Sequence, residues 1–269
     1  MKFGACMNKT KSTHATYGII YEDNKRNRFF IHSLVENSMI PIDIVHLLPT
    51  NKRYKPERGQ NPYLIAIAWS FINRLGWYDR IRRIIDRIFF PKSIQLVSTI
   101  KSSFNKYTCI SCKNINDQKV VDYVRTSNVD YWLVLDSDIV RKPLLETGKQ
   151  FLNSHKGYLP NVRGLSSTKW SVLTNKPFGA SVHLMDSGID TGPIVYREEF
   201  PITNTNVTDD QLNPEWQMQK TTIQKALESI FAGNTKFHPQ EMGTYFSSIH
   251  PILAEYAGNL QANKKEKGS

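Results

Sequence analysis

An amide, an imidazole and a carboxylate are the side chains whose spacing in this sequence could support chemistry. Asn153 and His155 follow an apolar run and are separated by one residue, so a strand would point both to one face. Asp190 lies in a loop after a second apolar run, where Gly188 and Gly192 permit backbone angles that other residues avoid. Without an evident serine or cysteine nucleophile, the pattern favours a reaction in which the substrate is the nucleophile. The protein would stabilise an oxyanion and move a proton.

Each of these three residues has a chemical role and a structural alternative. Asn153 could donate a hydrogen bond to a carbonyl oxygen, or it could cap a turn. His155 could donate to the same oxygen or shuttle a proton, or it could be a core imidazole with satisfied hydrogen bonds. Asp190 could hold the imidazole in one tautomer and favour its charged form, or it could be a cap. We predict the chemical roles, because all three residues are expected to converge on one pocket.

Alternating strand and helix patterns predict the scaffold that carries these residues. Residues 17–21, 41–48, 107–112, 131–135, 150–154 and 180–185 are predicted strands, and residues 23–37, 62–90, 117–126 and 216–231 are predicted helices. A short helical stretch is expected around Trp170, and residues 242–256 are predicted to form a closing helix or a hairpin. The succession predicts an α/β fold with a mostly parallel sheet flanked by helices. We expect a core, residues 1–200, and a short C-terminal extension, residues 201–269, packed on it.

Two further carboxylates follow the most apolar strand. Residues 131–135 are uniformly apolar, as in a central parallel strand that is covered on both faces. Asp136 and Asp138 come directly after it, at the carboxyl edge where open α/β sheets bind ligands. Turn and helix-cap chemistry is an equal alternative for both. Asn153 and His155 are expected at the same edge.

Three separated motifs resemble a known family. They are Asn153-Ser-His155, the turn Leu159-Pro-Asn-Val-Arg-Gly164 and the loop Asp186-Ser-Gly-Ile-Asp190-Thr-Gly192. In order and spacing they are similar to those of the formyltransferases that use 10-formyltetrahydrofolate. The resemblance implies a Rossmann-like formyltransferase core, catalytic roles for Asn153, His155 and Asp190, and 10-formyltetrahydrofolate as co-substrate without a metal. The folate would contact Leu135, Asp136, Asp138, Ile139, Met185, Asp186, Gly188 and Ile189, for which plain turn geometry is the alternative.

The choice of amine substrate is narrowed by the places where this sequence departs from the patterns of the family's subgroups. Residues 22–26 lack the glycines of the phosphate loop in a glycinamide ribonucleotide enzyme. The residues after Phe200 look more helical than the C-terminal β domain of a methionyl-tRNA formyltransferase, and the regulatory domain of a formyltetrahydrofolate hydrolase is not evident. The remaining subgroup formylates nucleotide-linked amino deoxy sugars, as in lipopolysaccharide O-antigen biosynthesis. Lys156, Tyr158 and Arg163 are candidate substrate contacts, although facing solvent or packing is the favoured alternative for Lys156 and Tyr158 and an equal one, as a surface residue, for Arg163.

Charge agrees with an anionic partner without identifying it. The chain has 35 Lys and Arg against 24 Asp and Glu, a net charge of +11, which suits polyglutamylated folate, nucleotide diphosphates or RNA. The resemblance favours a small nucleotide-sugar substrate over nucleic acid. Formylation of methionyl-tRNA or another amine, and a non-catalytic binding protein on the same fold, are the alternatives.

The apolar runs, the N-terminus and the cysteines indicate a cellular compartment. The longest apolar run, residues 63–72, is too short to span a bilayer, and the N-terminus lacks the apolar region of a signal peptide. Three cysteines fit a reducing compartment, and Cys109 and Cys112 are better explained as strand positions than as a zinc or redox pair. We therefore expect a cytoplasmic protein without a membrane partner, and a homodimer stays open.

Overall fold

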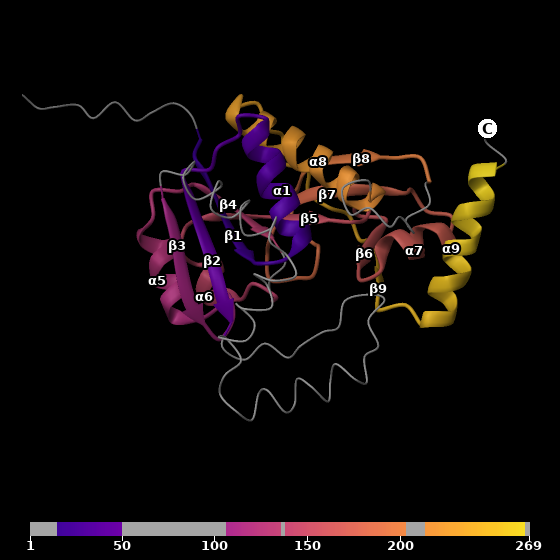
Figure 1. The fold of residues 1–269 in the computed structure, drawn as a ribbon, viewed down its shortest axis with the longest axis horizontal. Helices are drawn as coiled ribbons and strands as arrows, with labels where there is room; N and C mark the ends of the chain where they lie inside the picture. Colours follow the sequence, from indigo (N-terminus) through magenta and orange to yellow (C-terminus); the bar gives the residue numbers. More distant parts are fainter. Residues whose placement is uncertain (1–14, 50–105, 136–137, 203–212, 267–269) are drawn as a thin grey trace, which may run out of the picture.

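The fold is organised around one seven-stranded sheet. The computed structural model describes residues 15–49, 106–135, 138–202 and 213–266, so the predicted helix 62–90 lies outside the described residues. The strand order is β3-β2-β1-β4-β5-β7-β8 (Figure 1). Strands β1 to β5 run parallel, and β7 and β8 run antiparallel to their neighbours. The predicted Rossmann-like α/β fold with a mostly parallel sheet is confirmed.

The strands lie close to where the sequence places them. Their bounds are β1 Tyr17–Glu22, β2 Asp43–Pro49, β3 Tyr107–Cys112, β4 Tyr131–Leu135, β5 Gln150–His155, β7 Gly179–Leu184 and β8 Ile194–Glu199. The predicted strands 107–112 and 131–135 match to the residue. The sequence does not predict strand β8. It is an edge strand whose second half contains Tyr196, Arg197 and Glu198, so it lacks the run of apolar residues by which a strand is recognised.

Helices cover both faces of the sheet. On one face lie α1 Lys25–Glu36 and α8 Pro214–Phe231, which share a buried cluster with alternate strand residues such as Ile19 and Leu133. On the other lie α5 Gln118–Thr126 and the short α6 Lys142–Leu145, packed on the intervening residues such as Ile20 and Val134 (Figure 1). This alternation is the period-two pattern of strands buried on both faces.

One buried asparagine ties the start of α1 to the sheet. Asn24 caps the helix by accepting from the backbone N–H of Asn27. The Asn27 side chain, which is fully buried, donates to the carbonyl oxygens of Glu22 at 2.8 Å and Leu135 at 3.2 Å. The helix therefore begins between the carboxyl ends of β1 and β4. In this strand order that is the point where the chain's progression across the sheet reverses.

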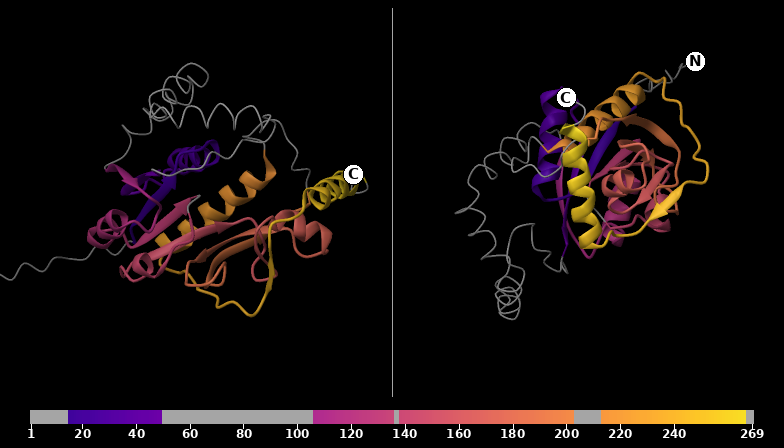
Figure 2. Two further views of the ribbon diagram at one scale, coloured as in Figure 1. Left: turned by 90° about the horizontal axis from the view of Figure 1, so that it is seen from below. Right: turned by 90° about the vertical axis from the view of Figure 1, so that its right-hand side faces the viewer.

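The C-terminal region reaches back to the predicted site motifs. Within residues 242–256 the structure has both a strand and the start of a helix, β9 Thr244–Phe246 and α9 Pro251–Glu266. Strand β9 pairs with β6 Val162–Gly164, inside the predicted turn motif, and α9 contacts α7 Ser167–Leu173. Helix α9 lies at the end of the molecule opposite β3 (Figures 1 and 2). None of the described helices is both long enough and apolar enough to cross a bilayer.

We predict that Gly18→Ala destabilises the sheet by about 1–3 kcal/mol through overpacking. A Cβ at Gly18 would lie 2.6 Å from Cζ3 of the fully buried Trp132 and 3.0 Å from the carbonyl oxygen of Asp43. Urea unfolding of the wild type, the single variants and the double variant with Trp132→Phe measures the coupling. The loss of stability caused by Gly18→Ala should be smaller when the indole of Trp132 is replaced. An equal loss with Trp132 and with Phe at this position would contradict the packing argument.

Candidate functional site

A cavity of about 410 Å³ opens at the carboxyl ends of β4 and β5, beside the first turn of α1. Its walls include Asn153, His155 and Asp190, together with Arg26, Asn27, Ser154, Gly164, Ser167, His183 and Gln219. This is the place where open α/β sheets bind ligands, next to the reversal of strand order between β1 and β4. The structure thus brings the three residues predicted to be catalytic into one pocket.

Strand β5 delivers the amide and the imidazole. Its antiparallel pairing with β7 sets Asn153 opposite His183 and His155 opposite Ser181. His155 Nε2 lies 2.9 Å from the carbonyl oxygen of Val162 and 3.2 Å from Ser167 Oγ. A carbonyl oxygen can only accept, so the Nε2 atom of His155 carries a hydrogen. A side chain at Gly157 would collide with this ring, because its Cβ would lie 2.5 Å from Nε2.

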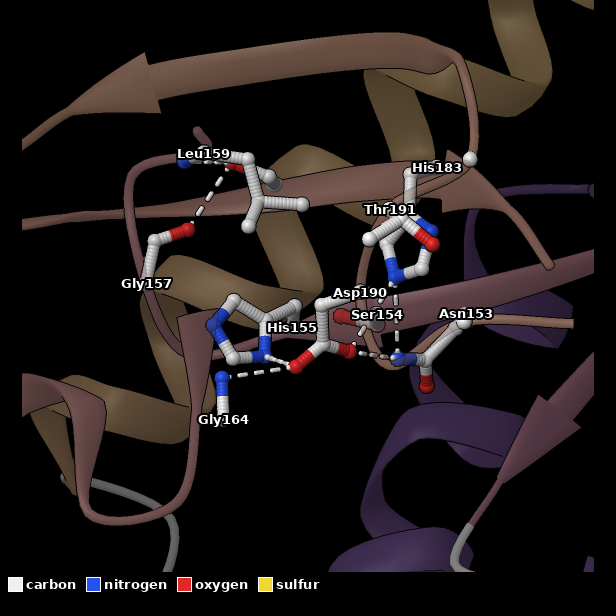
Figure 3. A network of polar contacts seen from close by, with 12 residues as sticks. Asn153, Ser154, His155, Gly157, Leu159, Gly164, His183, Asp190 and Thr191 are labelled. Carbon is white, nitrogen blue, oxygen red and sulfur yellow. Dashed lines mark hydrogen bonds and ion pairs between the residues drawn. The ribbon is translucent and has the colours of Figure 1, made fainter. Parts of the chain in front are cut away.

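Asp190 lies at the centre of the polar network (Figure 3). Its Oδ2 accepts from the backbone N–H of Gly164 at 2.9 Å and lies 3.4 Å from His155 Nδ1. Its Oδ1 accepts from Asn153 Nδ2 at 3.3 Å and lies 3.4 Å from His183 Nε2. The residue has a φ of 53°, in the left-handed region that Asp and Asn tolerate better than most residues. One carboxylate therefore contacts both Asn153 and His155, the other two residues that the sequence predicts to be catalytic.

Burial and charge act on Asp190 and His155 in opposite ways. Burial opposes ionisation of Asp190, but its contacts with His183, His155 and the N–H of Gly164 outweigh burial and lower its pKa to about 2. Burial lowers the pKa of His155, and the nearby Asp190 carboxylate only partly offsets this. At neutral pH the pair is therefore an ionised carboxylate beside a neutral imidazole. With its hydrogen on Nε2, the ring turns the unprotonated Nδ1 atom toward Asp190.

His183 was not predicted as a site residue. It lies inside strand β7, where the sequence reads as an apolar core strand, and only 3% of its side chain is exposed. A signal was present: Ser181 and His183 are polar residues at alternate positions of that strand, as expected for a face turned toward polar partners. Ser181 serves the site indirectly, since it accepts from the N–H of Leu159 and donates to the carbonyl of Gly157.

Most of the predicted folate contacts line the cavity. These are Leu135, Asp138, Ile139, Met185, Gly188 and Ile189. Asp136 lies outside the described residues. Asp186 instead accepts from the backbone N–H of Gly188 at 3.0 Å and from Thr191 Oγ1 at 2.6 Å, so it shapes the loop that carries Asp190. Six of the eight predicted folate contacts thus line the same cavity as Asn153 and His155, and contact with folate stays a prediction.

The predicted substrate contacts are less concentrated. Lys156 lines the cavity, and its Nζ lies 3.0 Å from Glu215 Oε2. Tyr158 instead packs under the guanidinium of Arg197, with the cation 4.8 Å from the ring centroid. Arg163 donates to the carbonyl oxygen of Gly243 at 3.0 Å. Neither Tyr158 nor Arg163 lines the cavity, because partners distant in sequence hold both side chains elsewhere.

Comparison with known sequences agrees with the motifs. A family model described as "Formyl transferase" matches residues 93–226. The methionyl-tRNA formyltransferase of Finegoldia magna is 30% identical over 161 residues, which cover 58% of this chain and 51% of that protein. The chain thus spans about half the length of this curated relative.

Solved structures with the same fold include sugar N-formyltransferases. The enzyme from a Shewanella species has a TM-score of 0.54 at 16% identity, over 92% of this chain and 88% of that chain. An N-formyltransferase from Helicobacter canadensis, in complex with folinic acid and dTDP-3-aminofucose, has a TM-score of 0.52 at 16% identity, over 93% and 82% of the two chains. Likeness at this level of identity shows a common fold.

We predict that Asp190→Asn lowers stability by about 2 kcal/mol at neutral pH, with a gap that narrows in acid. The fold lowers the pKa of this carboxyl from 3.8 to about 2, so its ionised form stabilises the protein above about pH 4. That contribution is lost as the pH falls toward 2, where the folded carboxyl becomes protonated. Asn suits the φ of 53° at this position, which keeps backbone strain out of the comparison.

Urea unfolding of both proteins at a series of pH values from about 5 to about 2.5 measures this gap. A stability difference that stays constant across the series would show that the carboxylate charge is not its source.

Proposed function

Residues 93–226 belong to the formyl transferase family, and on that premise we propose that the chain is a folate-dependent N-formyltransferase. It would transfer the formyl group of 10-formyltetrahydrofolate to the primary amine of a nucleotide-linked amino deoxy sugar. The observation that carries this proposal is the Asp190 carboxylate, which is 11% exposed and contacts both Asn153 and His155 on the cavity wall. These are the three residues that the sequence motifs select.

The network suits the proton transfers of such a reaction. The amine nitrogen attacks the formyl carbon and forms a C–N bond, and the carbonyl oxygen becomes an oxyanion. Collapse of this intermediate breaks the bond from carbon to N10. The amine loses one proton and N10 gains one, so the site has to hold a proton between the two steps.

Neutral His155 beside ionised Asp190 can take up that proton. Its Nδ1 lone pair faces Asp190 Oδ2 at 3.4 Å, longer than an ordinary hydrogen bond. Protonation at Nδ1 would turn this contact into a charge-assisted hydrogen bond. The imidazolium would also stabilise the oxyanion for as long as the proton is held there.

A nucleotide sugar is the substrate class that we favour. The net charge of +11 suits a diphosphate, and Lys156 contributes a cation to the cavity wall. Structures of sugar N-formyltransferases match more than nine-tenths of this chain. A role of the product in lipopolysaccharide O-antigen biosynthesis, and a cytoplasmic location, stay predictions.

Methionyl-tRNA is the second candidate, because the relative from Finegoldia magna formylates it according to its name. The positive charge would serve tRNA as well as it serves a nucleotide sugar. Both candidate substrates present a primary amine, and both would be formylated from the same co-substrate. They differ in the size and charge of the group that carries the amine.

The deciding experiment offers both kinds of amine. The purified chain is incubated with 10-formyltetrahydrofolate and a panel of thymidine- and uridine-linked 3-amino and 4-amino sugars, and separately with charged methionyl-tRNA. Mass spectrometry detects the added CO, and absorbance follows the release of tetrahydrofolate. Formylation of a sugar but not of the tRNA would support the proposal. Formylation of the tRNA alone would replace it, and no product from any amine would overturn the transferase assignment.

We predict that His155→Ala lowers kcat on the formylated amine by about 10²- to 10⁴-fold, the usual contribution of a positioned general acid or base. Affinity for folate should change much less, because the predicted folate contacts are other residues. His32→Ala is the matched control, since the side chain of His32 in α1 is 42% exposed and pairs with Glu36 at 3.2 Å. An equal loss in both variants, or full activity in His155→Ala, would contradict the role.

A further inference from the structure

The amide of Asn153 is held between two acceptors. Its Nδ2 lies 3.1 Å from His183 Nε2 and 3.3 Å from Asp190 Oδ1. Its Oδ1 points away from both groups, as Figure 3 shows. Asn153 lines the cavity, and no hydrogen bond joins its Oδ1 to any of the residues that the structure describes.

The tautomer of His183 follows from its other nitrogen. Nδ1 lies 2.7 Å from the carbonyl oxygen of Leu184, which can only accept a hydrogen bond. Nδ1 therefore carries a hydrogen, and in the tautomer with that single ring hydrogen Nε2 presents a lone pair. This lone pair can accept one N–H of Asn153, and Asp190 Oδ1 accepts the other.

The reverse orientation of the amide is unfavourable on two counts. It would place Oδ1 at about 3.3 Å from a carboxylate oxygen and at about 3.1 Å from the lone pair of Nε2, with acceptor facing acceptor in both cases. In a buried site such unpaired contacts are costly. The hydrogen-bond pattern therefore fixes which end of the amide faces the cavity.

We infer that His183 is a positioning residue that keeps the carbonyl oxygen of Asn153 turned into the cavity, where it accepts an N–H of the attacking amine. The inference rests on the proposed function. An acceptor at this point fits an amine, which has N–H groups, and does not fit the formyl oxygen, which is itself an acceptor. The oxygen would orient the amine so that its lone pair faces the formyl carbon. The role differs from the donor role that the sequence predicts for Asn153.

Two substitutions of His183 separate this role from a structural one. In His183→Gln the side-chain oxygen can occupy the place of Nε2 and accept from Asn153, while the donor to Leu184 is lost. In His183→Asn the amide nitrogen can occupy the place of Nδ1 and donate to Leu184, while the acceptor for Asn153 is lost. The rank order of the two variants therefore reports which nitrogen matters.

We expect kcat of His183→Asn to fall roughly tenfold or more below that of His183→Gln, the effect of losing about one hydrogen bond in the transition state. KM for 10-formyltetrahydrofolate should be similar in the two variants. The reverse order, or equal activities, would overturn the inference. A wild type that formylates no amine would instead remove the proposed function, so the two failures are distinguishable.

A measurement on the folded wild type removes the dependence on variant stability. Nitrogen-15 NMR of the labelled histidine rings reports which nitrogen of His183 is protonated. A proton on Nδ1 and none on Nε2 at neutral pH is the expected result. A proton on Nε2 would overturn the inference, because that atom could then no longer accept from Asn153.

Discussion

A largely buried carboxylate that must remain charged is the constraint on which the rest of the structure depends. Asp190 is 11% exposed, and the ionised form of a carboxylate is strongly disfavoured by burial unless donors surround it. The donors are the backbone N–H of Gly164 and the amide of Asn153. One comes from β6 and the other from β5, so two separate elements must meet at the loop that carries Asp190.

The antiparallel end of the sheet makes this meeting possible. Because β7 runs opposite to β5, its carboxyl end lies beside Leu152, and the loop after it folds back to place Asp190 against Asn153 and His155. Gln240 then fixes the loop from outside, since its Nε2 donates to the carbonyl oxygens of Asp190 at 3.1 Å and Gly192 at 2.6 Å. The C-terminal region thus helps to position the site, through this contact and through the pairing of β9 with β6.

The sequence predicted the parts of the site that depend on local pattern. The period-two spacing of Asn153 and His155 and the apolar runs before each loop were enough to place these residues and Asp190 in one pocket. It did not predict His183, because a single histidine in an apolar strand has the same local pattern whether it contacts a carboxylate or core side chains. Tyr158 and Arg163 show the other limit, since their partners Arg197 and Gly243 come from chain segments that local pattern does not bring near.

The distribution of hydrogens in the network argues that the site at rest is a proton acceptor. His155 and His183 each direct an N–H to a backbone carbonyl, of Val162 and Leu184 respectively. His155, which burial keeps neutral, therefore turns a lone pair toward the Asp190 carboxylate at 3.4 Å, and His183 turns its Nε2 atom toward the same carboxylate at 3.4 Å. A proton that enters the network gains a charge-assisted hydrogen bond at once, whereas a network that was already protonated would have no such place for it. In the proposed reaction the proton is released by the amine before N10 can take it up. A resting site without that proton can therefore accept it when the amine attacks. The same site, once it holds the proton, can donate it when the bond to N10 breaks.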